Sequence, residues 1–351
     1  MVVKIIVLYH GSCADGSMAA AVTALAHPMD EVHFMALNYV PNDGPIVDAA
    51  GLSLELRPDM WQYDSMIIVD FSLTEQQLAL FTKKYKSNLV VLDHHNVRQH
   101  SIYDEACTAV GVQPSSNMHF NAAGSGTLLA YMKQLTKFSS GGERVAMFLG
   151  HLIEISQLVS DRDIWVRSNV RAFEFYEGYA PEVFSDVEKT GVLYTELPST
   201  VSKCRNIIRK GNVEQLVQEG RARIVKRDAT IKELLETSAI FSKGNDFIQV
   251  PHVVVSAERA IRSEVGQYVF DHYPEYSLAL MVSCGHDDRA DTVFVSARSR
   301  PNYSYSAKKL SMDKGGNGHE NAAGFQIPKS EFDAHYPTIL LPLKQEEDVP
   351  A

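Results

Sequence analysis

The sequence lacks the cysteine pairs that hold a zinc ribbon or a disulfide framework together. Its four cysteines, Cys13, Cys107, Cys204 and Cys284, are widely scattered and form no CxxC pair. It also lacks an apolar run of membrane length, since the N-terminal stretch KIIVLY soon reaches polar residues. We interpret this stretch as a first β-strand and not as a signal peptide, and we expect a cytoplasmic protein with no membrane partner.

Net positive charge is also missing, because 33 Lys and Arg stand against 43 Asp and Glu, which gives a formal net charge of −10. Proteins that bind long nucleic acid through its phosphates usually present a basic face. We therefore expect no stable binding to long duplexes. The 351 residues, 45% of them hydrophobic, suffice for about two domains with a substantial core.

Strand-like and helix-like stretches alternate over the first third of the chain. The strand-like stretches are residues 3–9, 32–37, 65–72 and 88–95, and the helix-like stretches are residues 16–27 and 74–86. Residues 121–165 and most of 169–240 have helical patterns, and strands flanking a helix follow from residue 247. This order predicts an α/β fold: an N-terminal parallel sheet flanked by helices, a helical connector, and a smaller C-terminal α/β domain with a mixed sheet.

Acid and imidazole side chains follow three of the expected strands. They are His10 and Asp15 after the first strand, Asp70 after another, and Asp93, His94 and His95 after a third. The carboxyl ends of parallel strands meet at one edge of a sheet, so these groups should converge there. Clustered carboxylates repel each other, and a divalent cation relieves the repulsion.

An Asp and His ligand set with few sulfurs suits Mn²⁺, Mg²⁺ or Fe²⁺, and also admits Co²⁺ or Zn²⁺. Shared carboxylates indicate two ions, and an ion pair ~3.5–4 Å apart would stabilise both oxygens of an in-line phosphoryl displacement. The first loop, YHGSCADGS, has no G-x-x-x-x-G-K-[ST] pattern, which excludes a P-loop.

The stretch VLDHHN resembles the Asp-His-His signature of the DHH phosphoesterase superfamily. His10 with Asp15-Gly16 resembles the first motif of that family, Asp70 the second, and LVSDRDIW at 158–165 the fourth. Further along, GGNGHENAAGF at 315–325 is similar to the glycine-rich motif of the DHH-associated C-terminal domain. VSARSR at 295–300 and SEVG at 263–266 also fit that domain.

The resemblance implies roles for individual residues. Asp70 would bridge two metals, with His10 in the first site and Asp15, His94 and Asp161 completing the second; Asp161 is preferred over Asp163 because it directly follows the apolar run. Asp93 would orient His94, and His95 would face the phosphate as a donor or proton carrier. The implied substrate-binding residues are Arg298, Gly315, Gly316, Gly318 and His319.

One position departs from the family pattern, because Cys13 stands where the first motif usually has an aspartate. Cys13 could bind the first metal as a thiolate, could be a small packing residue, or could leave the first site weakened. We favour the packing role, since free cysteine is often simply buried.

The resemblance implies three regions: a DHH catalytic domain at residues 1–204, a helical connector at 205–245, and a substrate-binding domain at 246–345. It indicates a metal-dependent phosphodiesterase that hydrolyses short oligoribonucleotides or linear or cyclic dinucleotides to nucleoside monophosphates. The alternatives are a RecJ-like single-strand exonuclease, a nucleotide or polyphosphate phosphatase, and a metal-impaired protein that only binds nucleotides. The sequence leaves a homodimer open.

Overall fold

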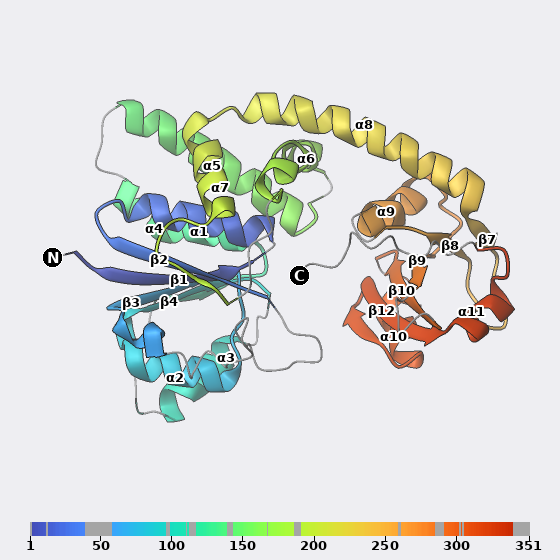
Figure 1. Ribbon diagram of the computed structural model, residues 1–351, viewed down its shortest axis with the longest axis horizontal. Coiled ribbons are helices and arrows are strands. Elements are labelled where there is room, and N and C mark those ends of the chain that lie inside the picture. Colours follow the sequence, from blue (N-terminus) through green and yellow to red (C-terminus); the bar gives the residue numbers. More distant parts are fainter. Residues whose placement is uncertain are drawn as a thin grey trace. The chain divides into compact units, whose positions relative to one another are not determined.

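The computed structural model describes residues 2–11, 13–38, 58–95, 99–109, 111, 117–138, 143–166, 168–185, 191–258, 261–284, 291–301, 303 and 305–339. The chain divides into two compact units, Met1–Ile224 and Val225–Ala351. Each unit contains one sheet with helices packed on it (Figure 1). No helix in the described ranges combines the length and the apolar character needed to cross a membrane.

The sheet of the first unit has the strand order β5-β4-β3-β1-β2-β6. Its strands are β1 (Lys4–His10), β2 (Glu31–Leu37), β3 (Ser65–Val69), β4 (Leu89–Asp93), β5 (Met118–Phe120) and β6 (Leu193–Tyr194). Only the pairing of β6 with β2 is antiparallel among these strands. The predicted parallel sheet is confirmed, and the short edge strand β6 was not predicted.

The helices of the first unit cover both faces of this sheet (Figure 1). They are α1 (Ala14–Ala26), α2 (Glu75–Tyr85), α3 (Gln99–Ala109), α4 (Gly126–Phe138), α5 (Glu143–Asp163), α6 (Val170–Val183) and α7 (Ser199–Lys210), with 3₁₀ turns η2 (Pro58–Gln62) and η3 (Lys86–Asn88). The long helix α8 (Val213–Ser238) follows α7 and spans the boundary between the units.

Alternation along β1 explains how one strand serves two cores. Ile5, Val7 and Tyr9 pack with α1 and its neighbouring helices, whereas Ile6 and Leu8 pack with α2 and α3 on the other face. Successive strand side chains point to opposite faces of a sheet, so a central strand covered on both sides must be apolar throughout. The run KIIVLY meets this requirement.

The second unit has a mixed sheet with the order β11-β12-β10-β9-β8-β7. Its elements are β7 (Ile240–Ser242), β8 (His252–Ser256), α9 (Arg262–His272), β9 (Leu278–Cys284), β10 (Thr292–Ser299), α10 (Ala307–Asp313), β11 (Asn317–His319), β12 (Ala322–Pro328) and α11 (Lys329–His335). β8 and β9 are parallel and the remaining pairs are antiparallel. The predicted mixed sheet is confirmed.

The order of the strands in the first sheet determines where the candidate site lies. β1 lies between β2 and β3, so the chain adds β2 on one side of β1 and β3 on the other. The loops after β1 and β3 leave the sheet on opposite sides of this reversal, where open α/β sheets bind ligands. His10 and Asp70 end or follow these two strands.

Candidate metal centre

Asp70 lies at the centre of the cluster at the carboxyl ends of β1, β3 and β4. It directly follows β3 and has a φ of 55°, in the left-handed region that is uncommon for an aspartate. Its side chain is 1% exposed. The backbone strain is retained because the surrounding contacts fix the residue, as is common at functional sites.

The two carboxylate oxygens of Asp70 face different neighbours. Oδ2 lies 3.5 Å from His10 Nδ1 and accepts a hydrogen bond of 3.4 Å from the Cys13 thiol. Oδ1 lies 3.1 Å from His94 Nε2 and 3.8 Å from His95 Nδ1. Burial alone would raise the pKa of Asp70, but hydrogen bonds with His10 and His94 outweigh it and lower the pKa. Asp70 is thus an anion placed between two groups of donors.

Two groups of three side chains have the arrangement of a metal site among the described residues. His10, Asp70 and His95 form the first triad, and Asp15, His94 and Asp163 form the second triad; within each, the donor atoms lie within 4.8 Å of one another. The nitrogen and oxygen donors suit divalent Mn, Mg, Fe or Zn ions. The His94–Asp70 contact joins the two triads.

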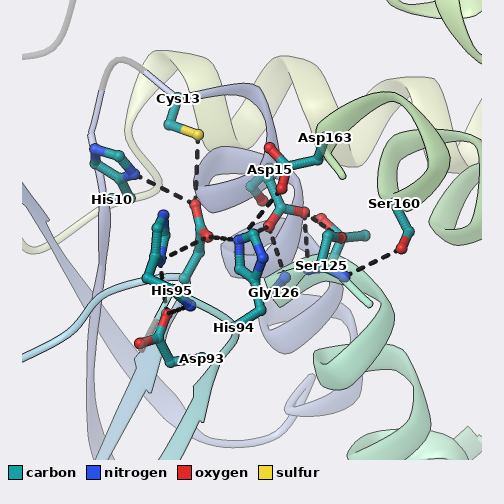
Figure 2. Close-up of polar contacts among 12 residues, drawn as sticks. His10, Cys13, Asp15, Asp93, His94, His95, Ser125, Gly126, Ser160 and Asp163 are labelled. Atoms are coloured by element: carbon teal, nitrogen blue, oxygen red, sulfur yellow. Dashed lines mark hydrogen bonds and ion pairs between the residues drawn. The ribbon is translucent and has the colours of Figure 1, made fainter. Parts of the chain in front are cut away.

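Asp15 is anchored by the N-terminus of α4. Its carboxylate accepts hydrogen bonds from the Ser125 hydroxyl at 2.6 Å and from the backbone N–H groups of Gly126 at 2.6 Å and Thr127 at 2.9 Å (Figure 2). The positive end of the helix dipole favours a carboxylate there. None of these three residues was predicted from the sequence, although a Ser-Gly-Thr run before an apolar stretch is a helix-start signal.

The second triad concentrates negative charge in a buried place. Burial raises the pKa of Asp15, and the nearby charges of Asp70 and Asp163 raise it further. Burial and Asp70 likewise raise the pKa of Asp163. A divalent cation would remove this repulsion, so both the donor set and its electrostatics fit the expected metal.

Asp163 joins the cluster instead of the expected Asp161. Its Oδ2 lies 3.2 Å from His94 Nε2, whereas the Asp161 carboxylate accepts hydrogen bonds from Gln157 at 2.7 Å and Asn169 at 2.6 Å. Residues two apart on a helix differ by about 200° in direction, so only one of the two aspartates can face the cluster. Proximity to the apolar run did not reveal which one.

The Asp93 carboxylate contacts His95 and not His94, the partner expected from the sequence. Its Oδ1 lies 2.7 Å from His95 Nδ1, and its Oδ2 accepts a hydrogen bond of 2.5 Å from the Ser72 hydroxyl. Burial lowers the pKa of His95, but the bond with Asp93 outweighs it and raises the pKa. His94 instead approaches Asp70 and Asp163; burial alone would lower its pKa, but these carboxylates and Asp15 raise the pKa to about 9.

Cys13 lies outside both triads. It occupies the residue before α1, and its side chain makes no cap hydrogen bond to that helix. Burial raises the pKa of its thiol, and the carboxylates of Asp70 and Asp15 raise it further. The protonated thiol therefore donates to Asp70, the contact that Figure 2 shows.

The expected substrate residues lie in the second unit. Arg298, on β10, donates to the Ser296 and Ser263 hydroxyls, both at 3.1 Å, and burial lowers its pKa. A Cβ atom at Gly316 would lie 2.1 Å from Gly324 O, and one at Gly318 would lie 2.4 Å from Ala323 Cα. The close packing beside β12 therefore leaves no room for a side chain at either position. The His319 side chain lies outside the described part of the chain.

Two solved structures are similar to this chain over most of its length. The pGpG-specific phosphodiesterase PggH from Vibrio cholerae aligns with a TM-score of 0.51 at 12% identity, covering 95% of this chain and 96% of that chain. The DHH domain of a protein described as a member of a family of ribosomal proteins aligns with a TM-score of 0.52 at 13% identity, covering 95% of this chain and 85% of that chain. No family model and no curated protein matches the chain. The chain therefore has the fold of DHH-domain proteins, and the resemblance read from the motifs is confirmed for the fold.

Proposed function

We propose that this protein is a divalent-metal-dependent phosphoesterase of the DHH superfamily. The observation that carries the proposal is the buried Asp70, which belongs to the first triad: its Oδ2 faces His10, and its Oδ1 faces His94 of the second triad as well as His95. A carboxylate in this position suits a bridge between two cations. Bound cations, Mn²⁺ being the first candidate, would supply an activated water and neutralise charge on the phosphate.

Residues of the two triads would hold the cations. His10 and Asp70 would hold one cation, and Asp15, Asp70, His94 and Asp163 the other. Asp163 would take the role that the family resemblance implies for Asp161. The α4 N-terminus fixes Asp15 in one orientation, so this ligand needs little reorganisation when the cation binds.

His95 is proposed to act on the phosphate. Asp93 engages its Nδ1, and its side chain is 33% exposed. Ser72 in turn holds Asp93. The Ser72–Asp93–His95 series would keep the imidazole in one orientation while Nε2 donates to a phosphate oxygen or transfers a proton.

The substrates we propose are short oligoribonucleotides and linear or cyclic dinucleotides, with nucleoside monophosphates as products. The acidic chain argues against long duplexes. The fold likeness to a protein described as a pGpG-specific phosphodiesterase supports a dinucleotide substrate. We further propose that Arg298 binds a substrate phosphate, because a guanidinium presents paired donors to phosphate oxygens.

Product identification tests the proposal. The protein is incubated with Mn²⁺ and, separately, with pGpG, a cyclic dinucleotide, a 20-nucleotide RNA, a mononucleotide and polyphosphate. We expect mononucleotides from the dinucleotides, at a rate that falls sharply for the 20-mer, and no turnover with Asp70→Asn. Release of orthophosphate from the mononucleotide or polyphosphate alone would establish a phosphatase and contradict the proposal, as would undiminished turnover by Asp70→Asn.

A further inference from the structure

A cavity of about 340 Å³ lies in the first unit, lined by parts of α1, β2 and α7. Its apolar lining includes Leu25 from α1, Val32 and Phe34 from β2, and Leu197, which precedes α7. Two guanidiniums, those of Arg205 and Arg209, also line it. The cavity thus combines apolar side chains with two guanidinium groups.

The two arginines lie four residues apart on α7, so they are neighbours on one helix face. Like charges at this spacing oppose each other. Within the described ranges, no hydrogen bond or ion pair engages either guanidinium. Burial and the charge of Arg209 lower the pKa of Arg205. The α7 sequence STVSKCRNIIRK supplies no acid of its own.

Asp30, an acidic residue that also lines the cavity, is already engaged by His27, another lining residue. Asp30 Oδ2 lies 2.8 Å from His27 Nδ1, and Lys137 Nζ lies 2.7 Å from His27 Nε2. This Asp30–His27–Lys137 series carries no net negative charge, since burial keeps the pKa of His27 low and the ring neutral. The positive charge of the two arginines therefore remains available to a ligand.

The cavity is separate from the candidate metal centre. Asp15 lies at the start of α1, whereas Ala24 and Leu25, which line the cavity, lie in its last turn. The 13 residues of α1 make a helix ~20 Å long at 1.5 Å per residue. Figure 1 shows α7 with α1 on one side of the sheet.

We propose that this cavity binds a phosphate monoester that carries a ring, such as a nucleoside monophosphate. Two adjacent guanidiniums match the oxygens of a dianionic phosphate. The apolar lining matches a ring, and the volume is within the range of small-molecule sites. This ligand chemistry follows from the cavity itself and does not depend on the reaction at the metal centre.

Calorimetric titration of GMP into the full chain, with metals removed by a chelator, tests the proposal. Arg209 is exposed, so Arg209→Gln should keep the fold, and its loss of a charged phosphate contact should weaken GMP binding by about tenfold. Lys210→Gln, which alters the adjacent charge outside the cavity lining, should leave the affinity unchanged. Asp70→Asn, which alters the metal centre, should also leave it unchanged.

Two further probes test the ligand class. Guanosine lacks the phosphate and inorganic phosphate lacks the ring, so both should bind at least about tenfold more weakly than GMP. Equal affinity of either probe and GMP would overturn the proposed class. Equal GMP affinity of Arg209→Gln and the unaltered chain, or loss of all GMP binding in Asp70→Asn, would overturn the site.

Discussion

Two aspartates near the end of α5 differ in what their carboxylates contact. Asp163 reaches His94, and Asp161 reaches Gln157 and Asn169. This difference offers a matched pair of substitutions, because both change the same type of side chain on the same helix turn. Comparing the two variants distinguishes the loss of a carboxylate within the proposed metal site from the loss of a carboxylate that only lies near it.

We expect Asp163→Asn to lose a bound divalent cation and at least about 100-fold of turnover, a loss of roughly 2.7 kcal/mol in transition-state stabilisation. The neutral amide removes one of the charges that the cation would offset. Asp161→Asn should keep both metal and turnover. Metal content by mass spectrometry and kcat with Mn²⁺ measure the two effects. The reverse pattern, with Asp161→Asn losing the metal, would return the ligand role to Asp161.

His95→Gln should lower kcat by about 10²–10⁴-fold, the usual contribution of a positioned acid or base, without changing the metal content. The matched control is His33→Gln, since His33 Nδ1 lies 2.7 Å from Tyr63 Oη on another part of the sheet. Metal analysis beside the kinetics makes the test decisive. A loss of metal in His95→Gln would make His95 a ligand of the first triad.

Cys13→Ala should retain the metal and most of the turnover, because Cys13 lies outside both triads and donates only a weak hydrogen bond to Asp70. Cys13→Ser provides the comparison, as its hydroxyl preserves a donor at that position. Mn²⁺ titration of turnover measures the effect. If Cys13→Ala loses one metal per chain and all turnover, the cysteine is a ligand.

At the scale of elements, the junction between β1 and α1 determines where Asp15 lies. A Cβ atom at Gly16 would lie 2.2 Å from His10 O and 2.8 Å from His10 Cβ. The helix can approach the end of the strand this closely only because residue 16 has no side chain. The glycine beside Asp15 therefore positions the first turn of α1, and with it the Asp15 carboxylate.

Gly16→Ala should lower the free energy of unfolding by about 1–3 kcal/mol, as overpacking does, and should lower turnover by displacing Asp15. Gly150→Ala on α5 is the control, because a Cβ atom there meets nothing within 4 Å. It should instead raise stability by about 0.5–1 kcal/mol through helix propensity. Urea unfolding of both variants gives the comparison. An unchanged Gly16→Ala protein would contradict the close approach.

At the scale of the whole molecule, each unit has its own hydrophobic core and its own buried hydrogen bonds between polar side chains. In the second unit, His252 is fully buried; its Nδ1 lies 2.7 Å from Val250 O and its Nε2 2.7 Å from Tyr336 Oη. The neutral ring donates from Nδ1 and accepts from the tyrosine hydroxyl. Burial raises the pKa of Tyr336 to about 12, so the phenol keeps its proton.

Burial lowers the pKa of His252 below 6.5, which predicts a pH dependence of stability. Below about pH 6.5 the unfolded chain binds a proton that the folded chain does not. The contribution of the neutral, buried His252 to the free energy of unfolding is therefore fully present above about pH 6.5. It is lost as the pH falls from there toward the lower pKa of His252 in the folded chain. The melting temperature should fall more between pH 7.5 and 5.5 for the unaltered chain than for His252→Asn. Equal falls in both proteins would contradict this prediction.

Local pattern alone predicted a large part of this molecule. Apolar runs of strand length, interrupted by helix-like stretches, required a parallel sheet covered on both faces, because such strands have no polar side to expose. The positions of His10, Asp70 and Asp93 at the ends of those runs follow from the same pattern. Since parallel strands end at one edge, their convergence was determined before any packing detail.

Tertiary structure decided the rest, because it depends on residues far apart in the chain. Asp15 and the α4 N-terminus are separated by 110 positions, and Asp163 enters the cluster through the rotation of α5, which the letters SDRD leave open. The two-residue strand β6 is too short to form a pattern. The cavity lined by α1, β2 and α7 likewise arises where three elements distant in the sequence meet. Sequence periodicity specifies which face of an element is apolar, whereas the contacts between faces require the packed chain.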